Sequence, residues 1–385
     1  MKYSRKINIL FKRSLHHFLI RFRYYDRVFF MLLRYFSRPD YNADGFNVFG
    51  YFSKYLGQSE VARVFVNKLI SQDEHYTLVD FYDGTHKRIT IEEEEKYLKH
   101  YYKKLKYKNN IFFIDLMVLR DLMKQIPILF RNKHNIVTFW WEFESGFEDR
   151  IPILNEFDEV YVFSDFIKNT LTRVEDRKFK IIKIKYPFIK NWTIEESPMA
   201  VRNKNCLENK FCFFFNFDYL SSYNRKNPEA ILKALHEEFP TEEEVVFVVK
   251  TSNTLGFEDK EKKFISLVKE YRLTDRVIIN KDQLTRSGLM TLLNSMDCYI
   301  SLHRGEGLGL GILEAFALDK PVIATNYGGN TEYMDHPLGY PVPYTLVRAN
   351  DDYLAYRNVI SWAEPDIDYA KKFMREVYIQ YKMNN

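Results

Sequence analysis

The sequence is poor in cysteine, glycine and proline, with 3 Cys, 14 Gly and 12 Pro among 385 residues. So few cysteines exclude a disulfide-stabilised scaffold, and Cys206, Cys212 and Cys298 lack the CxxC spacing of zinc and redox motifs. The low glycine and proline content excludes collagen-like and low-complexity chains. All three cysteines lie in or next to apolar stretches. We therefore expect buried, reduced thiols and a cytoplasmic protein.

Long apolar runs are also missing, since no stretch reaches the roughly 18 apolar residues that a membrane-spanning helix needs. Residues 1–38 instead carry ten Lys or Arg and a single acidic residue, interleaved with apolar side chains. Basic residues interrupt every apolar stretch there, unlike in a secretory signal. Such a basic amphipathic segment can lie on the cytoplasmic face of an anionic membrane as a peripheral contact. The alternative is an ordinary helix with a solvated basic face.

The rest of the chain is mildly acidic, and no nucleic-acid-binding motif accompanies the basic segment, so we expect no nucleic-acid partner. Hydrophobic residues make up 46% of the sequence, enough for two cores, and short apolar runs alternate with helical patterns. This alternation predicts parallel strands joined by crossover helices. The expected strands are Phe46–Tyr51, Tyr76–Phe81, Ile111–Ile114, Ile136–Phe139, Glu159–Phe163, Ile181–Ile184, Phe211–Phe217, Val245–Lys250, Arg276–Ile279, Cys298–Leu302 and Pro321–Thr325.

The polar stretch 190–210 lacks clear periodicity and is the expected linker. We accordingly predict an α/β protein with two Rossmann-like doubly wound domains and a basic N-terminal helical segment. The expected divisions are 1–38 for that segment, 39–200 and 201–350 for the two domains, and 351–385 for C-terminal helices.

The segment from Ser301 to Ala315 carries the clearest chemistry. It follows an expected strand, opens an expected helix and has glycines at alternate positions, Gly307, Gly309 and Gly311. Such glycines let the backbone approach a ligand, and the N–H groups of a helix N-terminus favour phosphate. Glu306 can accept hydrogen bonds from a sugar, and Glu314 from ribose hydroxyls. The segment therefore predicts a nucleotide-sugar site.

Three other interpretations of this segment stay open. A nicotinamide dinucleotide fingerprint also has glycines after a strand, but it expects an acidic residue about 20 positions later. Residues 322–329 contain no acidic residue. A glycine-rich surface turn and a non-catalytic sugar-nucleotide sensor are the other two.

The segment resembles the Glu-x7-Glu signature of glycosyltransferase family 4, the retaining enzymes of GT-B fold with two domains facing a central cleft. The resemblance covers roughly residues 46–380. Similar stretches are Leu56–Arg63, Asn135–Glu144, Phe157–Ser164, Phe217–Pro228, Met296–Ser301, Leu318–Glu332 and Trp362–Pro365.

The resemblance implies roles for individual residues. Glu306 would contact the donor sugar, and Lys226 with Arg225 would neutralise the departing phosphate. The remaining donor-binding residues would be the diphosphate-facing Gly307, Leu308, Gly309 and Leu310, the ribose-binding Glu314, a second phosphate contact at Lys250, and Gly57 from the opposite domain. Trp141 and Glu142 would line the acceptor side.

Two positions depart from the family pattern, because Ser59 stands where a second glycine is frequent and Gly311 where a proline is common. No metal is expected, because no Asp-x-Asp motif is placed to hold a metal–diphosphate complex, and no cofactor is expected beyond the nucleotide-sugar donor. We expect a hexosyltransferase that uses a nucleoside-diphosphate sugar and a glycan or lipid-linked saccharide acceptor in surface polysaccharide biosynthesis. A non-catalytic sugar-nucleotide-binding protein and a membrane-surface scaffold are the alternatives.

Overall fold

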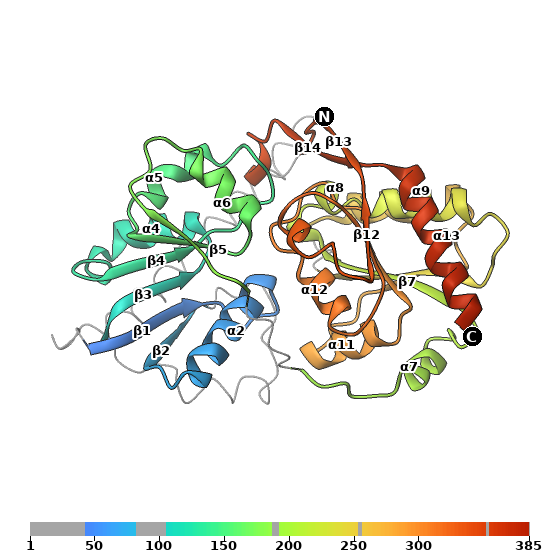
Figure 1. Ribbon diagram of the computed structural model, residues 1–385, viewed down its shortest axis with the longest axis horizontal. Helices are drawn as coiled ribbons and strands as arrows, with labels where there is room; N and C mark the ends of the chain where they lie inside the picture. The colour runs from blue at the N-terminus through green and yellow to red at the C-terminus, as the bar shows by residue number, and fades with distance from the viewer. Residues whose placement is uncertain (1–42, 82–104, 187–191, 253–255, 352–353, 385) are drawn as a thin grey trace, which may run out of the picture. The chain divides into compact units, whose positions relative to one another are not determined.

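A computed structural model describes residues 43–81, 105–186, 192–252, 256–351 and 354–384 (Figure 1). The basic segment 1–38 lies outside the described residues. The chain forms two compact units. Of the described residues, the first unit contains those up to Thr138 with Pro152–Tyr161 and Lys178–Lys180. The second unit contains Phe139–Ile151, Val162–Arg177 and the described residues from Ile181 onward.

The first sheet has six strands in the order β2-β1-β3-β4-β5-β6. Strands β1 to β5 pair in parallel, and the order reverses direction between β1 and β3. The strands are β1 (Ala43–Gly50), β2 (Tyr76–Asp80), β3 (Tyr107–Phe113), β4 (His134–Thr138), β5 (Glu159–Val162) and β6 (Lys180–Lys183). The intervening helices are α2 (Gly57–Ser71), α4 (Leu116–Gln125), α5 (Ile151–Leu154) and α6 (Asp165–Thr172), with short η1 (Pro127–Leu129) and η2 (Glu148–Arg150).

The second sheet is parallel and has the order β12-β11-β10-β7-β8-β9. Counted from β7, this is the Rossmann strand order, which reverses between β7 and β10. Its strands are β7 (Phe211–Asp218), β8 (Val245–Ser252), β9 (Val277–Asn280), β10 (Cys298–Ser301), β11 (Val322–Thr325) and β12 (Gly339–Val342). Ligands of such sheets bind beyond the carboxyl ends of the strands at the reversal, which places the loops after β7 and β10 at the expected site.

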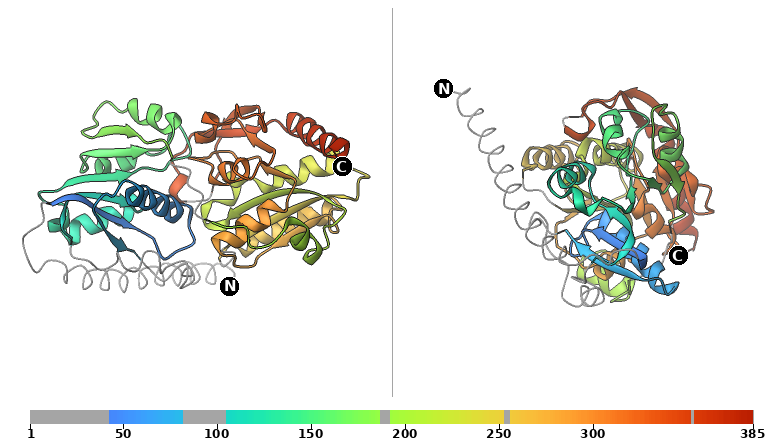
Figure 2. Two further views of the ribbon diagram at one scale, coloured as in Figure 1. Left: turned by 60° about the horizontal axis from the view of Figure 1, so that its bottom comes forward. Right: turned by 90° about the vertical axis from the view of Figure 1, so that its left-hand side faces the viewer.

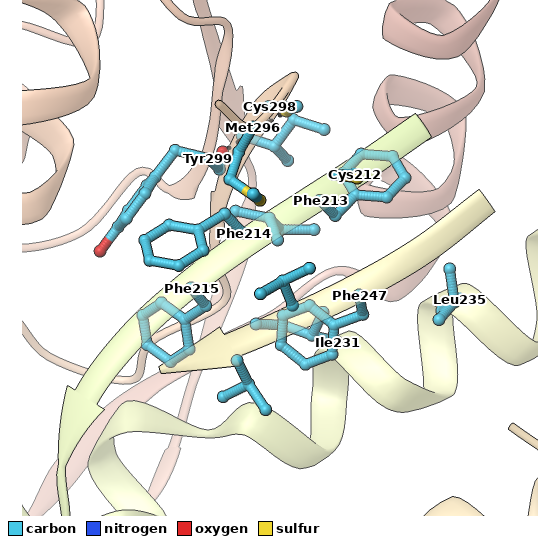
Figure 3. Packing of buried hydrophobic residues seen from close by; sticks show 14 of the residues in the cluster. Cys212, Phe213, Phe214, Phe215, Ile231, Leu235, Phe247, Met296, Cys298 and Tyr299 are labelled. Carbon is cyan, nitrogen blue, oxygen red and sulfur yellow. Dashed lines mark hydrogen bonds between the residues drawn. The ribbon is translucent and has the colours of Figure 1, made fainter. Parts of the chain in front are cut away.

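The core of the second unit is built around β7, the first strand of the second sheet in sequence order, which is rich in phenylalanine. Phe213, Phe214 and Phe215 are successive residues of β7, each at most 1% exposed. Because strand side chains alternate between faces, this run predicts a sheet covered on both sides. Figure 3 shows these rings with Ile231 of α9 (Pro228–Glu238) and Phe247 of β8 in one cluster. The expected α/β architecture with two Rossmann-like sheets is confirmed.

The other helices of the second unit are α7 (Pro198–Lys204), α8 (Tyr223–Lys226), α10 (Glu258–Glu270), α11 (Arg286–Asn294), α12 (Leu310–Phe316) and α13 (Ile367–Asn384), with short η3 (Tyr219–Ser221), η4 (Gly329–Glu332) and η5 (Leu354–Tyr356). Helix α13 packs beside α9 (Figures 1 and 2), where Lys371 and Arg375 form ion pairs with Glu237 and Glu238. No helix within these described parts is both long and apolar enough to cross a membrane.

Three expectations about local structure were wrong. The tail 351–385 is not helical throughout, because β14 (Ser361–Pro365) pairs antiparallel with β13 (Tyr344–Arg348) and buries Trp362. The expected linker contains α7, whose Ser197 cap and first-turn Pro198 outweigh its weak periodicity. Cys206 is exposed in a left-handed conformation after α7, whereas Cys212 and Cys298 are buried as expected.

Candidate active site

Two loops meet at the reversal point of the second sheet. The loop after β7 carries Arg225 and Lys226 on α8, and the loop after β10 runs through Glu306 to α12. Their backbones are joined, since the Arg304 N–H donates to the Arg225 carbonyl over 2.8 Å. The Asn227 side-chain amide also donates to the Leu302 carbonyl over 3.0 Å. Residues 75 positions apart in the sequence are thus held side by side.

Lys226 and Glu306 form the central ion pair of this region. Lys226 Nζ lies 2.5 Å from Glu306 Oε2, and the two side chains are only 16% and 15% exposed. Burial alone would raise the pKa of Glu306, but the charges of Lys226 and Arg225 outweigh it and lower this pKa to about 2. Burial lowers the pKa of Lys226, and the Glu306 carboxylate opposes that shift. Glu306 is therefore ionised at neutral pH beside a partly desolvated cation.

Arg225 lies next to this pair, and its side chain donates hydrogen bonds mainly to backbone carbonyls. Its Nη1 donates to the Gly305 carbonyl over 2.8 Å, and Nη2 donates to the Ser221 carbonyl over 2.8 Å. The guanidinium also lies 3.7 Å from Glu306 and 3.8 Å from Glu142. Two carboxylates thus share two cations, which brings together all the residues named catalytic in the sequence with one named for the acceptor side.

His303 is fully buried next to this cluster and is neutral. Its Nε2 lies 3.1 Å from the Tyr327 carbonyl, which can only accept a hydrogen bond, so Nε2 carries the proton. Its Nδ1, 3.0 Å from the Ser301 hydroxyl, is then the acceptor. Burial lowers the pKa of His303 to about 4. The ring ties the loop after β10 to the loop after β11 without adding charge.

The aromatic segment that follows β4 packs directly against the glycine loop. A Cβ at Gly305 would lie 2.6 Å from the Phe143 ring and 2.8 Å from the Glu142 carbonyl. Trp141 is 4% exposed, stacks with Phe139 and donates its indole N–H to the Ser145 carbonyl. The absence of a side chain at Gly305 is therefore required by packing. Trp141 takes part in a buried aromatic cluster, and its expected role beside an acceptor stays a prediction.

Helix α12 begins where the glycine pattern predicts. Gly309 is its N-cap with φ 77°, a left-handed conformation suited to glycine. Leu308 is buried, and the first-turn N–H groups of Leu310 and Gly311 have no acceptor within the helix. A Cβ at Gly311 would collide with the Tyr299 hydroxyl, which lies 3.1 Å from the Asn216 side-chain oxygen. Tyr299 thus fills the space beside the position where the family commonly has proline.

Glu314 lies in the second turn of α12 and is buried. Its Oε1 is 2.7 Å from Nη1 of Arg286, the first residue of α11, and the two side chains are 4% and 16% exposed. Arg286 was not named from the sequence, because only its position at a helix start could be predicted. The pair fixes the carboxylate that was expected to hold a ribose.

The other expected donor residues have different surroundings. Lys250 on β8 is 8% exposed and donates to the Thr251 carbonyl over 2.9 Å, and burial lowers its pKa. Gly57 is the exposed first residue of α2 in the first unit, so its role opposite the donor loop stays a prediction. Ser59 in the same turn is fully buried, and its hydroxyl has no hydrogen-bond partner among the residues that the structure describes.

Comparisons with known proteins cover the segment that carries these loops. Residues 219–349, which include both loops, match the sequence model of the glycosyl transferases group 1. No curated protein matches the sequence.

Solved structures resemble the fold at low sequence identity. Sucrose-phosphate synthase from Thermosynechococcus elongatus is 15% identical with a TM-score of 0.59, over 88% of this chain and 90% of that chain. Anabaena HepE in complex with UDP-glucose is 17% identical with a TM-score of 0.56, over 74% and 82%. An Escherichia coli trehalose-6-phosphate structure bound with UDP-2-fluoro glucose is 10% identical with a TM-score of 0.54, over 77% and 88%.

The fold is the GT-B fold of these solved structures, and the sequence match over residues 219–349 indicates a glycosyltransferase. The segment 219–349, about a third of the chain, is similar to the glycosyl transferases group 1. The enzyme class expected from the sequence is confirmed.

Proposed function

We propose that this glycosyltransferase transfers a hexose-type sugar from a UDP-sugar to a glycan or lipid-linked saccharide, with retention of anomeric configuration, in surface polysaccharide biosynthesis. UDP is proposed as the carrier because two of the similar structures contain UDP-sugars or their analogues. Retention follows the family resemblance, and the lipid-linked acceptor follows the basic character of residues 1–38.

One observation carries the proposal, namely the 2.5 Å contact between Lys226 and Glu306. The bond that breaks in a sugar nucleotide joins the anomeric carbon to a phosphate oxygen. A cation for the phosphate and a carboxylate for the sugar hydroxyls must therefore lie next to each other. Lys226 and Glu306 have this arrangement at the reversal point of the sheet, and Glu314 lies farther along α12 for the ribose.

The chemical step breaks the bond between the anomeric carbon and the phosphate oxygen, forms a bond from the acceptor hydroxyl oxygen to that carbon, and passes the hydroxyl proton to the departing nucleoside diphosphate. Negative charge grows on the leaving phosphate, and Lys226 stabilises it in surroundings where water is scarce. Lys250 adds a second buried cation at the carboxyl end of β8. Glu306 accepts hydrogen bonds from the sugar, and Arg225 holds the Gly305 carbonyl so that this loop keeps its position. No residue is proposed as a covalent nucleophile.

A thermal-shift screen of the full chain against UDP-, GDP-, ADP- and TDP-sugars tests the donor. We expect UDP-sugars to raise the melting temperature and one of them to be hydrolysed slowly without acceptor. Glu306→Ala should abolish this turnover, whereas the exposed α9 variant Glu237→Ala should not. Binding without turnover would favour the sugar-nucleotide-binding alternative, and no shift with any donor would contradict the site.

Metal independence is a separate part of the proposal. We expect turnover to be unchanged by EDTA, because the leaving group would be neutralised by Lys226, Lys250 and backbone N–H groups. Loss of activity on chelation, restored by a divalent cation, would show that this part is wrong.

Membrane attachment through residues 1–38 rests on their charge pattern alone. Full-length protein should co-sediment with phosphatidylglycerol vesicles at low salt, and protein lacking residues 1–38 should not. Equal sedimentation of the two forms would remove the reason for proposing a lipid-linked acceptor.

A further inference from the structure

The short helix that carries Lys226 is bounded by two non-glycine residues in left-handed conformations. Ser222, its N-cap, has φ 66° and ψ 110°, and Asn227, its C-cap, has φ 51°. Asparagine adopts this conformation relatively often, but serine rarely does, so the backbone at Ser222 is strained. Ser222 is only 3% exposed. Such a conformation persists where the surroundings hold it in place.

The Ser222 hydroxyl has a partner on each side. Its oxygen accepts a hydrogen bond from the Arg225 N–H over 3.2 Å, which caps α8. Its proton is donated to Oδ2 of Asp351, because a carboxylate can only accept. Asp351 follows β13 and lies 129 positions later in the sequence. A hydrogen bond to an ionised acceptor is stronger than one between neutral groups, so Asp351 is suited to holding a strained residue.

A second contact from the same C-terminal region holds the neighbouring loop. Glu364 of β14 receives two hydrogen bonds from Arg304, over 2.6 and 2.9 Å. Arg304 Nη1 also donates to the Asn224 carbonyl over 2.9 Å, and its guanidinium lies 4.9 Å from the centre of the Trp362 ring. The region that contains β13 and β14 thus contacts the loops of both Lys226 and Glu306.

We propose that Asp351 is a positioning residue for the transfer reaction, acting through the Ser222 hydroxyl to hold α8 in the conformation that directs Lys226 at the leaving phosphate. Asp351 itself contacts no substrate in this scheme. The inference rests on the proposed function, since it assigns Lys226 to the leaving group. It goes beyond that function by assigning control of the lysine's placement to a distant carboxylate.

A double-mutant cycle between Ser222→Ala and Asp351→Ala tests the inference. Each single variant should lower kcat about tenfold while KM for the UDP-sugar stays within about twofold, because misplacing Lys226 weakens an interaction that matters most in the transition state. The double variant should be no slower than the slower single variant, because both substitutions break the same hydrogen bond. Asp351→Asn keeps an acceptor oxygen and should lose less activity than Asp351→Ala.

Two measurements separate positioning from loss of folded enzyme. Titration calorimetry with UDP should give one site per chain in every variant, which counts the folded sites. Asp368→Asn is the matched control, because Asp368 also follows β13 in the sequence but pairs with Lys371 at an 87% exposed position. It should keep wild-type kcat and KM.

The inference is overturned if Asp351→Ala keeps kcat within twofold of wild type, or if the two single effects multiply in the double variant. A lower UDP stoichiometry that accounts for all of the lost activity in both Asp351→Ala and Asp351→Asn would also overturn it. Failure of the wild-type enzyme to bind UDP or turn over any sugar nucleotide would instead contradict the proposed function, and the inference would fall with it.

Discussion

Replacing Lys226 by methionine removes the cation at the centre of the site while keeping an unbranched side chain of similar length. The ionised form of Glu306 is favoured strongly in the folded protein, since its pKa falls from 4.5 to about 2. At 1.36 kcal/mol per pKa unit, this corresponds to about 3 kcal/mol, to which Lys226 contributes more than Arg225. Lys226→Met should therefore destabilise the fold by about 2 kcal/mol at neutral pH, because Arg225 at 3.7 Å remains.

The same substitution should affect catalysis more than stability. Removing one preorganised group that stabilises developing charge typically lowers kcat by about 10² to 10³. We expect a loss in this range at saturating UDP-sugar, measured as UDP release, and partial retention of activity in Lys226→Arg. Lys233→Met is the control, because Lys233 on α9 is 52% exposed and pairs with Glu237 one turn farther along the same helix. A kcat above about a tenth of wild type in Lys226→Met would refute the assignment of Lys226 to the leaving group.

The pH dependence gives a second readout of this variant. Because the folded-state pKa of Glu306 is lowered, its contribution to stability is present above about pH 4.5 and is lost as the pH falls towards 2. In Lys226→Met this pKa should rise back towards 4.5, so the loss should be complete at a higher pH. Acid unfolding curves of the two proteins that run in parallel would contradict this expectation.

Three further predictions follow from the site. Gly305→Ala should destabilise the fold by about 1–3 kcal/mol, seen as a lower urea midpoint, because the added Cβ would press on Phe143 and the Glu142 carbonyl; an unchanged midpoint would contradict the packing argument. Arg286→Met should weaken UDP binding about tenfold in calorimetry, because Glu314 loses the partner that fixes it, with a smaller change in kcat; unchanged affinity would argue against a ribose contact. The lowered pKa of His303 means that stability present above pH 6.5 is lost as the pH falls towards 4, by about 3 kcal/mol in total, so His303→Gln should unfold with a weaker pH dependence across this interval. Equal pH dependence in the two proteins would show that His303 is not buried as a neutral ring.

The strands could be predicted because each one is marked by a run of apolar residues in its own segment of the sequence. Runs such as Phe211–Phe215 are apolar at every position, which is typical of a strand buried on both faces of a parallel sheet. Strand β14 and helix α7 were missed for the opposite reason. The strand character of Ser361–Pro365 comes from pairing with Tyr344–Arg348, and α7 depends on the Ser197 cap rather than on an apolar stripe.

The candidate site was predictable in composition but not in its connections. Glu306 was named because the glycine spacing and the acidic residues around it indicate a sugar nucleotide, and Lys226 and Arg225 were named from the family resemblance. Nothing in that pattern indicates that Arg286 pairs with Glu314 or that Asp351 accepts a hydrogen bond from Ser222. The residues of each pair lie far apart in the sequence, and their spacing does not tell which distant residues come into contact. Cys206 was predicted to be buried from its apolar neighbours, whereas its left-handed backbone after α7 exposes it.

The sequence by itself determined that the chain forms two α/β domains and carries a nucleotide-sugar signature, because hydrophobic period, glycine spacing and acidic residues at set positions are local properties. Tertiary structure alone decided which charges neutralise one another and why particular glycines are needed. Gly305 was unassigned in sequence, and it is the aromatic ring of Phe143, folded onto it from a segment more than a hundred residues earlier, that leaves no room for a side chain. Burial strengthens the ion pairs of the site, because water no longer screens their charges.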